Sequence, residues 1–327
     1  MEVVFQEIND DEIRRRLQAA ATGNPIDAQP FFNQFDFSIY RKNGQHLEAY
    51  TRTIEVLAKL KQLDSAAYEK IHKGNPYYFC AISAFFLRKY VNAVYFFDAA
   101  ASEDIKNDPD KRTPAILFME MDGEDSHQNA LQLTQLAGSI LTEFIDQYNQ
   151  MGGAIPITLV DIRTKLLTRA VNDHQEWRTL STSLISYLLE WSDLFVYQEI
   201  RTLDGTWEPL FTHLFKGCVL FESLLKANPS VVNPGNTLGN ILNQNSGIKK
   251  VLGIHRNIKM SDSKFNGVLG DLPSLANNIE TSIEMAARLR NTIGHSVVWA
   301  TSITSAQYVK LVRIVMDAIL HTISGLY

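Results

Sequence analysis

The stretch LANNIETSIEMAARLRNTIGHSVVW, residues 275–299, decides the fold class. Its apolar side chains recur every three to four residues, which is the spacing of one face of an α-helix. At about 100° per residue, one stripe of this helix is formed by Ile279, Ile283, Ala286, Arg290, Ile293 and Val297. A second face carries Glu284, Asn291 and His295, with Arg288 beside them. Arg290 therefore interrupts an apolar stripe, where an unpaired guanidinium would be costly.

The rest of the chain shows the same helical period, and we find no convincing strand alternation. Helices are expected over residues 45–63, 76–101 (as a pair), 127–150, 156–173, 177–200, 208–227, 237–244, 275–299 and 304–324. Residues 101–126 contain two prolines and an Asp-Gly turn among many acids, which predicts a linker or loop. Together these patterns predict an all-α protein.

The best candidate for a domain boundary is RTLDGTWEP, residues 201–209. It divides the chain into an α-helical region, 1–204, and an antiparallel helical bundle, 205–327. Alanines and aromatics over residues 81–100 resemble one tetratricopeptide-like unit, which suggests helical hairpins that bind a protein partner or sense a signal. From residue 205 onward the chain carries 11 Lys and Arg against 7 Asp and Glu, whereas the preceding part carries 20 against 29. The mildly basic second part hints at a polyanionic partner.

Composition bounds the class of protein further. Apolar residues make up 45% and charged residues 20%, which is ordinary for a folded soluble chain. Cys80 and Cys218 are the only cysteines, and each lies in an apolar helical run, which suits a reducing compartment. The N-terminus lacks the pattern of a signal peptide, and no apolar run approaches the ~20 residues of a membrane span. We therefore expect a cytoplasmic protein that does not contact membranes.

A hexapeptide within the helix, RNTIGH at 290–295, resembles the Arg-x4–6-His motif of the HEPN superfamily, in which Asn often follows the Arg. The context is similar as well, because an aromatic-rich helix (214–229) and a short TLGNIL segment precede the motif, and an amphipathic helix follows it. The resemblance covers residues 205–327 and implies a HEPN-like bundle that acts as a metal-independent endoribonuclease. In that superfamily two protomers face each other and form a composite site.

The resemblance also implies roles for individual residues. His295 would serve as general acid or base while the ribose 2′-OH attacks the adjacent phosphate, leaving a 2′,3′-cyclic phosphate. Arg290 would bind the scissile phosphate, and Asn291 would orient the histidine or hold the phosphate. No metal ligand set and no cofactor motif is expected. Because Arg290 and His295 lie about 140° apart around a straight helix, a homodimer in which two copies surround one cleft is expected.

Two alternatives stay open at this stage, and one position departs from the pattern of the superfamily. Arg288, with six residues before His295, also satisfies the broader motif spacing. Val297 stands where antitoxin-controlled HEPN toxins often carry a Tyr, so regulation through that position is not supported. The residues could also be a helix end with a capping His and a structural Arg paired to a neighbour such as Glu284. In that case the bundle is a catalytically inert dimerisation or protein-interaction module.

A polar stretch over residues 245–274 supplies the candidate RNA-backbone contacts. With Arg288, these are Lys249, Lys250, Arg256, Lys259 and Lys264. The stretch is interrupted by Gly, Ser and Asn, so a solvated loop is an equal alternative. For the histidines other than His295, no catalytic or metal-binding partner lies at a recognisable spacing in the sequence, and we expect surface or core roles for them. A setting in phage defence or stress response is implied by the superfamily alone.

Overall fold

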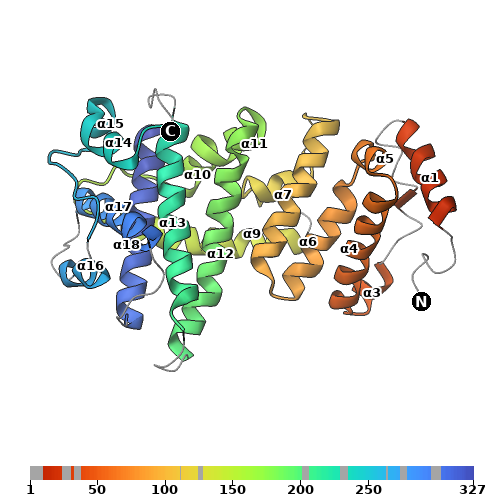
Figure 1. Cartoon of the computed structure of the whole chain (residues 1–327), viewed down its shortest axis with the longest axis horizontal. Coiled ribbons are helices and arrows are strands. Elements are labelled where there is room, and N and C mark those ends of the chain that lie inside the picture. Colours follow the sequence, from red (N-terminus) through yellow and green to blue (C-terminus); the bar gives the residue numbers. More distant parts are fainter. Residues whose placement is uncertain are drawn as a thin grey trace. The chain divides into compact units, whose positions relative to one another are not determined.

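The computed structural model describes residues 10–23, 31–32, 38–110, 112–123, 128–200, 206–228, 235–262, 264–272, 278–295 and 303–327. These residues fold almost entirely into helices, and none of them forms a strand; a single isolated bridge joins Gly152 to Asn278 (Figure 1). The prediction of an all-α fold is therefore confirmed. Among the described helices, none is long and apolar enough to cross a membrane.

The chain divides into two compact units, residues 1–134 and 135–327, and the division falls within α9 (Gln128–Tyr148). The helices of the first unit are α1 (Asp10–Thr22), α3 (Ser38–Lys42), α4 (His46–Leu63), α5 (Ser65–Lys70), α6 (Gly74–Phe86), α7 (Tyr90–Asn107) and α8 (Pro114–Met119). Those of the second are α10 (Leu159–Ile162), α11 (Thr168–Asn172), α12 (Arg178–Ile200), α13 (Glu208–Ala227), α14 (Leu238–Gln244), α15 (Ser246–Val251), α16 (Phe265–Asp271), α17 (Ile279–His295) and α18 (Ser305–Leu326). A π-helical turn, Arg163–Leu167, joins α10 to α11.

In the first unit, α6 and α7 pack along each other as a helical hairpin. The predicted linker over 101–126 is wrong for most of its length, because α7 continues to Asn107 and α8 is buried from Ala115 to Met119. Pro114 is a helix-start residue here: Thr113 caps α8 by accepting from the Ile116 N–H. The acids had suggested a solvated loop, but the apolar run AILFM packs into the core, where Phe118 stacks on Phe97 at 4.2 Å.

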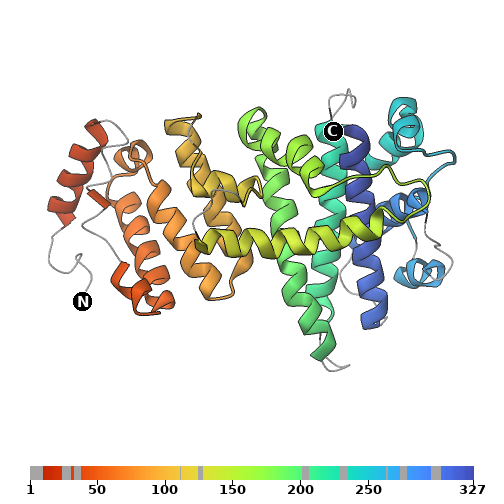
Figure 2. The ribbon, with the colours of Figure 1, turned by 180° about the vertical axis from the view of Figure 1, so that it is seen from behind.

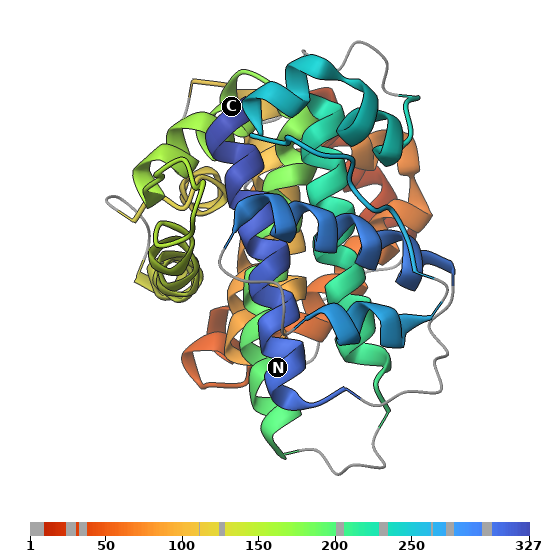
Figure 3. The ribbon, with the colours of Figure 1, turned by 90° about the vertical axis from the view of Figure 1, so that its left-hand side faces the viewer.

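The second unit is built around α13, α17 and α18, which contact one another pairwise. Figure 3 shows α17 lying across α18 and α13. Figure 2 shows the later part of α9 on the other side of the unit, where Phe144 contacts Trp191 and Tyr148 hydrogen-bonds His321 at 2.9 Å. The predicted boundary at 204/205 lies inside this unit, because α12 packs directly against α13.

Close helix packing fixes this arrangement. Gly217 of α13 lies so near α12 and α18 that an added Cβ would come within 2.7 Å of the Tyr187 ring and of Val315. At the N-terminal end of α18, Thr304 and Gln307 form a reciprocal capping box that fixes where the helix begins. α17 buries both apolar side chains, such as Ile283, and charged ones, such as Arg288. These buried side chains hold α17, and with it the candidate site, in place.

Candidate functional site

Arg290 is held in place by α13. Its Nε donates to Oε2 of Glu222 at 2.6 Å, and Nη1 donates to the Asn291 side-chain oxygen at 3.2 Å. The second oxygen of Glu222 pairs with Lys226 at 2.7 Å. Burial raises the pKa of Glu222, but the hydrogen bonds from Lys226 and Arg290 outweigh it, so the pKa stays below its usual value and the carboxyl is ionised. The guanidinium in the apolar stripe is thus neutralised by a partner helix.

Arg290 and Asn291 line an open pocket of about 400 Å³. The other walls are Glu222 and Lys226 of α13, the segment from Gly235 to Gly239 at the start of α14, and Met260. Asn291 is fixed by donating to the Met260 carbonyl at 2.7 Å, whereas the Arg290 side chain stays 36% exposed. Two cations and one carboxylate face this space, so it carries one net positive charge that suits a phosphate.

His295 lies at the C-terminal end of α17 and is exposed. It is about 7.5 Å beyond Arg290 along the helix axis and is not part of the pocket wall. The preceding Gly294 packs on α13, since an added Cβ would lie 3.2 Å from the Phe215 ring. The structure therefore brings Arg290 and Asn291 together and leaves His295 facing solvent. Val297 lies outside the described residues.

Arg288 has a different environment from Arg290, although the two are only two residues apart. It is 1% exposed, and its Nε and Nη2 donate to Asp262 and Asp271, each at 2.6 Å. A further contact joins Nη2 to the Gly267 carbonyl at 3.3 Å. A guanidinium enclosed in this way has no face left for RNA in this conformation. Of the two candidate arginines, Arg290 is therefore the one that a phosphate could reach.

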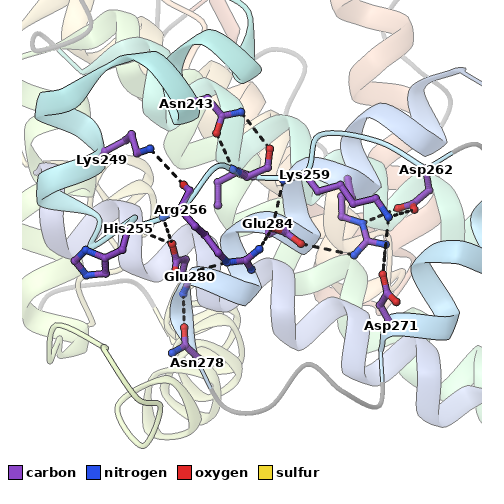
Figure 4. Close-up of polar contacts among 12 residues, drawn as sticks. Asn243, Lys249, His255, Arg256, Lys259, Asp262, Asp271, Asn278, Glu280 and Glu284 are labelled. Carbon is purple, nitrogen blue, oxygen red and sulfur yellow. Dashed lines mark hydrogen bonds and ion pairs between the residues drawn. The ribbon is translucent and has the colours of Figure 1, made fainter.

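The basic stretch forms part of the same ionic network (Figure 4). Arg256 pairs with Glu284 at 2.7 Å, and Lys259 pairs with Asp262 at 2.6 Å. Lys249 donates to the backbone carbonyl of Arg256 at 3.3 Å, while Lys250 and Lys264 lie exposed. Because Arg256, Lys259 and Arg288 already have carboxylate partners, the stretch is a weaker phosphate-binding surface than its sequence suggests.

Two other histidines of the second unit have structural roles. His213 is fully buried and stacks on Tyr187; its Nδ1 accepts from the Tyr308 hydroxyl at 2.9 Å, and its Nε2 donates to the Tyr187 carbonyl at 3.0 Å. Burial lowers the pKa of His213 to about 3, so its ring is neutral. His321 is likewise buried, with Nε2 at 3.2 Å from the Leu252 carbonyl. The expectation of core roles is confirmed for this pair.

Sequence reasoning missed Glu222 and Lys226, the two charged residues that line the pocket together with Arg290. The signal was present: they form an acid–base pair four residues apart on a helix that is mostly apolar, LFKGCVLFESLLKA. Such a pair usually stabilises its own helix, so nothing in the sequence pointed toward α17.

Comparison with known proteins adds no relative: no protein-family model, no curated protein and no solved structure matches the chain. The resemblance to the HEPN superfamily therefore depends on the RNTIGH motif and its helical context alone. In the part of the chain that the structure describes, no group of three or more His, Cys, Asp or Glu side chains is placed to hold a metal ion.

Proposed function

We propose that the C-terminal bundle, residues 205–327, is a HEPN-like, metal-independent endoribonuclease that acts as a homodimer. One observation carries the proposal: the motif helix α17 presents Arg290 and Asn291 on a positively charged open pocket and ends in an exposed histidine, His295. A guanidinium and an amide can stabilise the phosphate, and an imidazole can move the proton, when a 2′-hydroxyl attacks the phosphorus and the 5′-oxygen leaves.

In this proposal each side chain has a separate role. Glu222 holds Arg290 by its Nε and Asn291 accepts from Nη1, which leaves Nη2 and the second N–H of Nη1 to donate to oxygens of the scissile phosphate. Lys226 adds a second positive charge at the pocket wall. His295 takes the proton of the attacking 2′-hydroxyl or gives a proton to the leaving 5′-oxygen, because an imidazole can act as a general base or as a general acid. The product is a 2′,3′-cyclic phosphate.

The homodimer follows from the separation of the two motif residues. Arg290 faces α13 from one side of α17, whereas His295 lies further along and on another face. A second copy that brings its own α17 alongside would place both sets of residues around one phosphate. We infer that the composite site needs both protomers, and RNA and a second copy are the proposed partners of this unit.

A second candidate function is an inert HEPN-like interaction module, with the N-terminal helices as a platform for another protein. The observation that favours it is the 2.6 Å ion pair between Arg290 and Glu222. An incoming phosphate has to compete with that carboxylate for the guanidinium. If the pair is never opened, the bundle keeps its fold without the chemistry.

The test is cleavage of labelled RNA in EDTA by the full chain, with the oligomeric state measured by light scattering in the same buffer. We expect cyclic-phosphate ends and a loss of about 100-fold or more in His295→Ala and Arg290→Ala. His255→Ala is the matched control, because His255 is also exposed on this unit but is outside the motif. Absence of cleavage by the dimer across several RNAs supports the inert module, and equal activity in all variants refutes the assignment of the site.

A further inference from the structure

A second pocket, of about 560 Å³, lies at the opposite end of α17. Its walls come from the first turns of α17, one face of α18, the end of α12, and Met151. Val309 and Ile314 make much of the α18 wall apolar, and Asp317 lies among them. The volume is in the range of pockets that hold small organic molecules. None of its lining residues is shared with the pocket around Arg290.

Asp317 is the unusual group in this pocket. Its side chain is buried, with 2% exposure, and lines the space. Asp317 is not hydrogen-bonded or ion-paired to any residue that the structure describes. Burial raises the pKa of Asp317 to about 7, although Arg313 one turn earlier lowers it. A buried carboxyl that lacks a partner is costly, and native proteins keep such groups where they serve a purpose.

The other charged and titratable groups around Asp317 have partners elsewhere or lie nearer the surface. Lys310 of α18 donates to the Leu272 carbonyl at 2.8 Å, and Glu199 of α12 accepts from Gln198 at 2.7 Å. Tyr148 of α9, whose own pKa is raised mainly by burial and in part by Asp317, makes its hydrogen bonds to Ile155 and His321. Arg313 lines the same pocket but is more exposed than Asp317. The deepest charge that a ligand meets is therefore a carboxylate.

We propose that this pocket binds a small organic molecule bearing a cationic nitrogen, an amine or an amidinium, with Asp317 as its anchor. The apolar wall takes the hydrocarbon body of the ligand, and the carboxylate accepts charge-assisted hydrogen bonds from the nitrogen. Anionic ligands are disfavoured, because they would bring a second negative charge against a buried one. This site does not depend on the proposed ribonuclease activity.

The site shares α17 with the motif residues. Thr281 and Ser282 line the pocket in the first turn of that helix, and Arg290 follows about 13 Å further along its axis. A bound ligand would contact the helix that carries Arg290 and His295 without touching either residue. The position is that of a regulatory site or a second binding site, separate from the phosphate pocket.

Benzamidine is a suitable probe, and its neutral isostere benzamide is the matched control ligand. Calorimetric titration of the full chain at pH 8 should show benzamidine binding at least about tenfold tighter than benzamide. Asp317→Asn should lose at least about tenfold in benzamidine affinity, whereas Asp146→Asn, an exposed carboxyl on α9, should not. In the wild-type chain, binding should weaken as the pH falls below about 7, because protonation removes the anionic anchor while benzamidine stays charged.

Three results would overturn the proposal: no benzamidine binding by the wild-type chain, equal binding of benzamide, or unchanged binding in Asp317→Asn. A special case of the third result is that Glu199→Gln abolishes binding while Asp317→Asn retains it. The ligand would then pair with Glu199, and the assignment of Asp317 as the anchor would be overturned. The pH series on the wild-type chain gives an independent check, because it needs no variant to fold.

Discussion

Asp317→Asn should stabilise the chain, and the gain should grow as the pH rises. Asp317 has a folded-state pKa of about 7, above its ordinary value of 3.8, because burial disfavours the charged carboxylate. The folded state therefore holds the proton of the Asp317 carboxyl more tightly than the unfolded chain does. Stability from this group is fully present below pH 3.8 and is lost as the pH rises through 7. The amide of Asn carries no charge, so the variant avoids this loss.

The magnitude follows from the two pKa values. At pH 8, where the folded-state carboxyl is ionised, the group costs about 4 kcal/mol. At pH 5 the folded chain keeps the proton that the unfolded chain has released, and the cost is about 1.7 kcal/mol. The difference between the two pH values, about 2.5 kcal/mol, is the more reliable quantity. It excludes any pH-independent cost of burying an amide in place of a carboxylic acid. At roughly 2–4 °C per kcal/mol, the gain in Tm from Asp317→Asn should be about 5–10 °C larger at pH 8 than at pH 5.

Differential scanning calorimetry of the wild-type and variant chains at pH 5 and pH 8 measures this directly. Every other titrating group is common to both chains, so its contribution cancels in the comparison. Asp146→Asn, which removes an exposed carboxyl, should change Tm little at either pH. An equal shift of Tm at both pH values, or a smaller gain at pH 8, would refute the reasoning, because it would mean that the Asp317 carboxyl is solvated or paired.

Further predictions concern the ionic network, the motif and the helix packing. Arg288→Met should lower the free energy of unfolding by about 3–5 kcal/mol, because it leaves the carboxylates of Asp262 and Asp271 without their buried partner. Arg290→Met should lower it clearly less. Urea denaturation of both variants tests this, and equal losses would contradict it. Glu222→Gln should tighten binding of inorganic phosphate severalfold, measured by titration, because it removes a negative charge from the pocket while the Gln oxygen can still accept from Arg290 Nε; weaker binding would mean that the arginine needs the charged carboxylate to hold its position. Gly217→Ala should destabilise the fold by about 1–3 kcal/mol through the clash with Tyr187, and a thermal melt no lower than that of the wild-type chain would show that the helices can move apart.

The sequence by itself determined the helices, because a helix is specified locally by its apolar period and its caps. The predicted helix over 208–227 matches α13, and that over 304–324 agrees with α18 to within two residues. The predicted helix over 275–299 contains α17, whose described part ends at His295. Where a local signal had two meanings, the sequence failed. The proline and acids around α8 indicated a loop as readily as a helix start, and only the core that receives Phe118 distinguishes them.

The tertiary structure decided which charges are available. Arg288 and Arg290 are nearly neighbours, and helical periodicity placed Arg290, not Arg288, in the apolar stripe. Their environments depend on segments far away in sequence: Asp262 and Asp271 enclose Arg288, while Glu222 of α13 leaves Arg290 open to a pocket. Within the basic stretch, Asp262 also pairs with Lys259, and Glu284 pairs with Arg256. A helical pattern predicts which side of a helix is buried. Only the segments that pack against that helix determine whether a buried charge has a counter-ion.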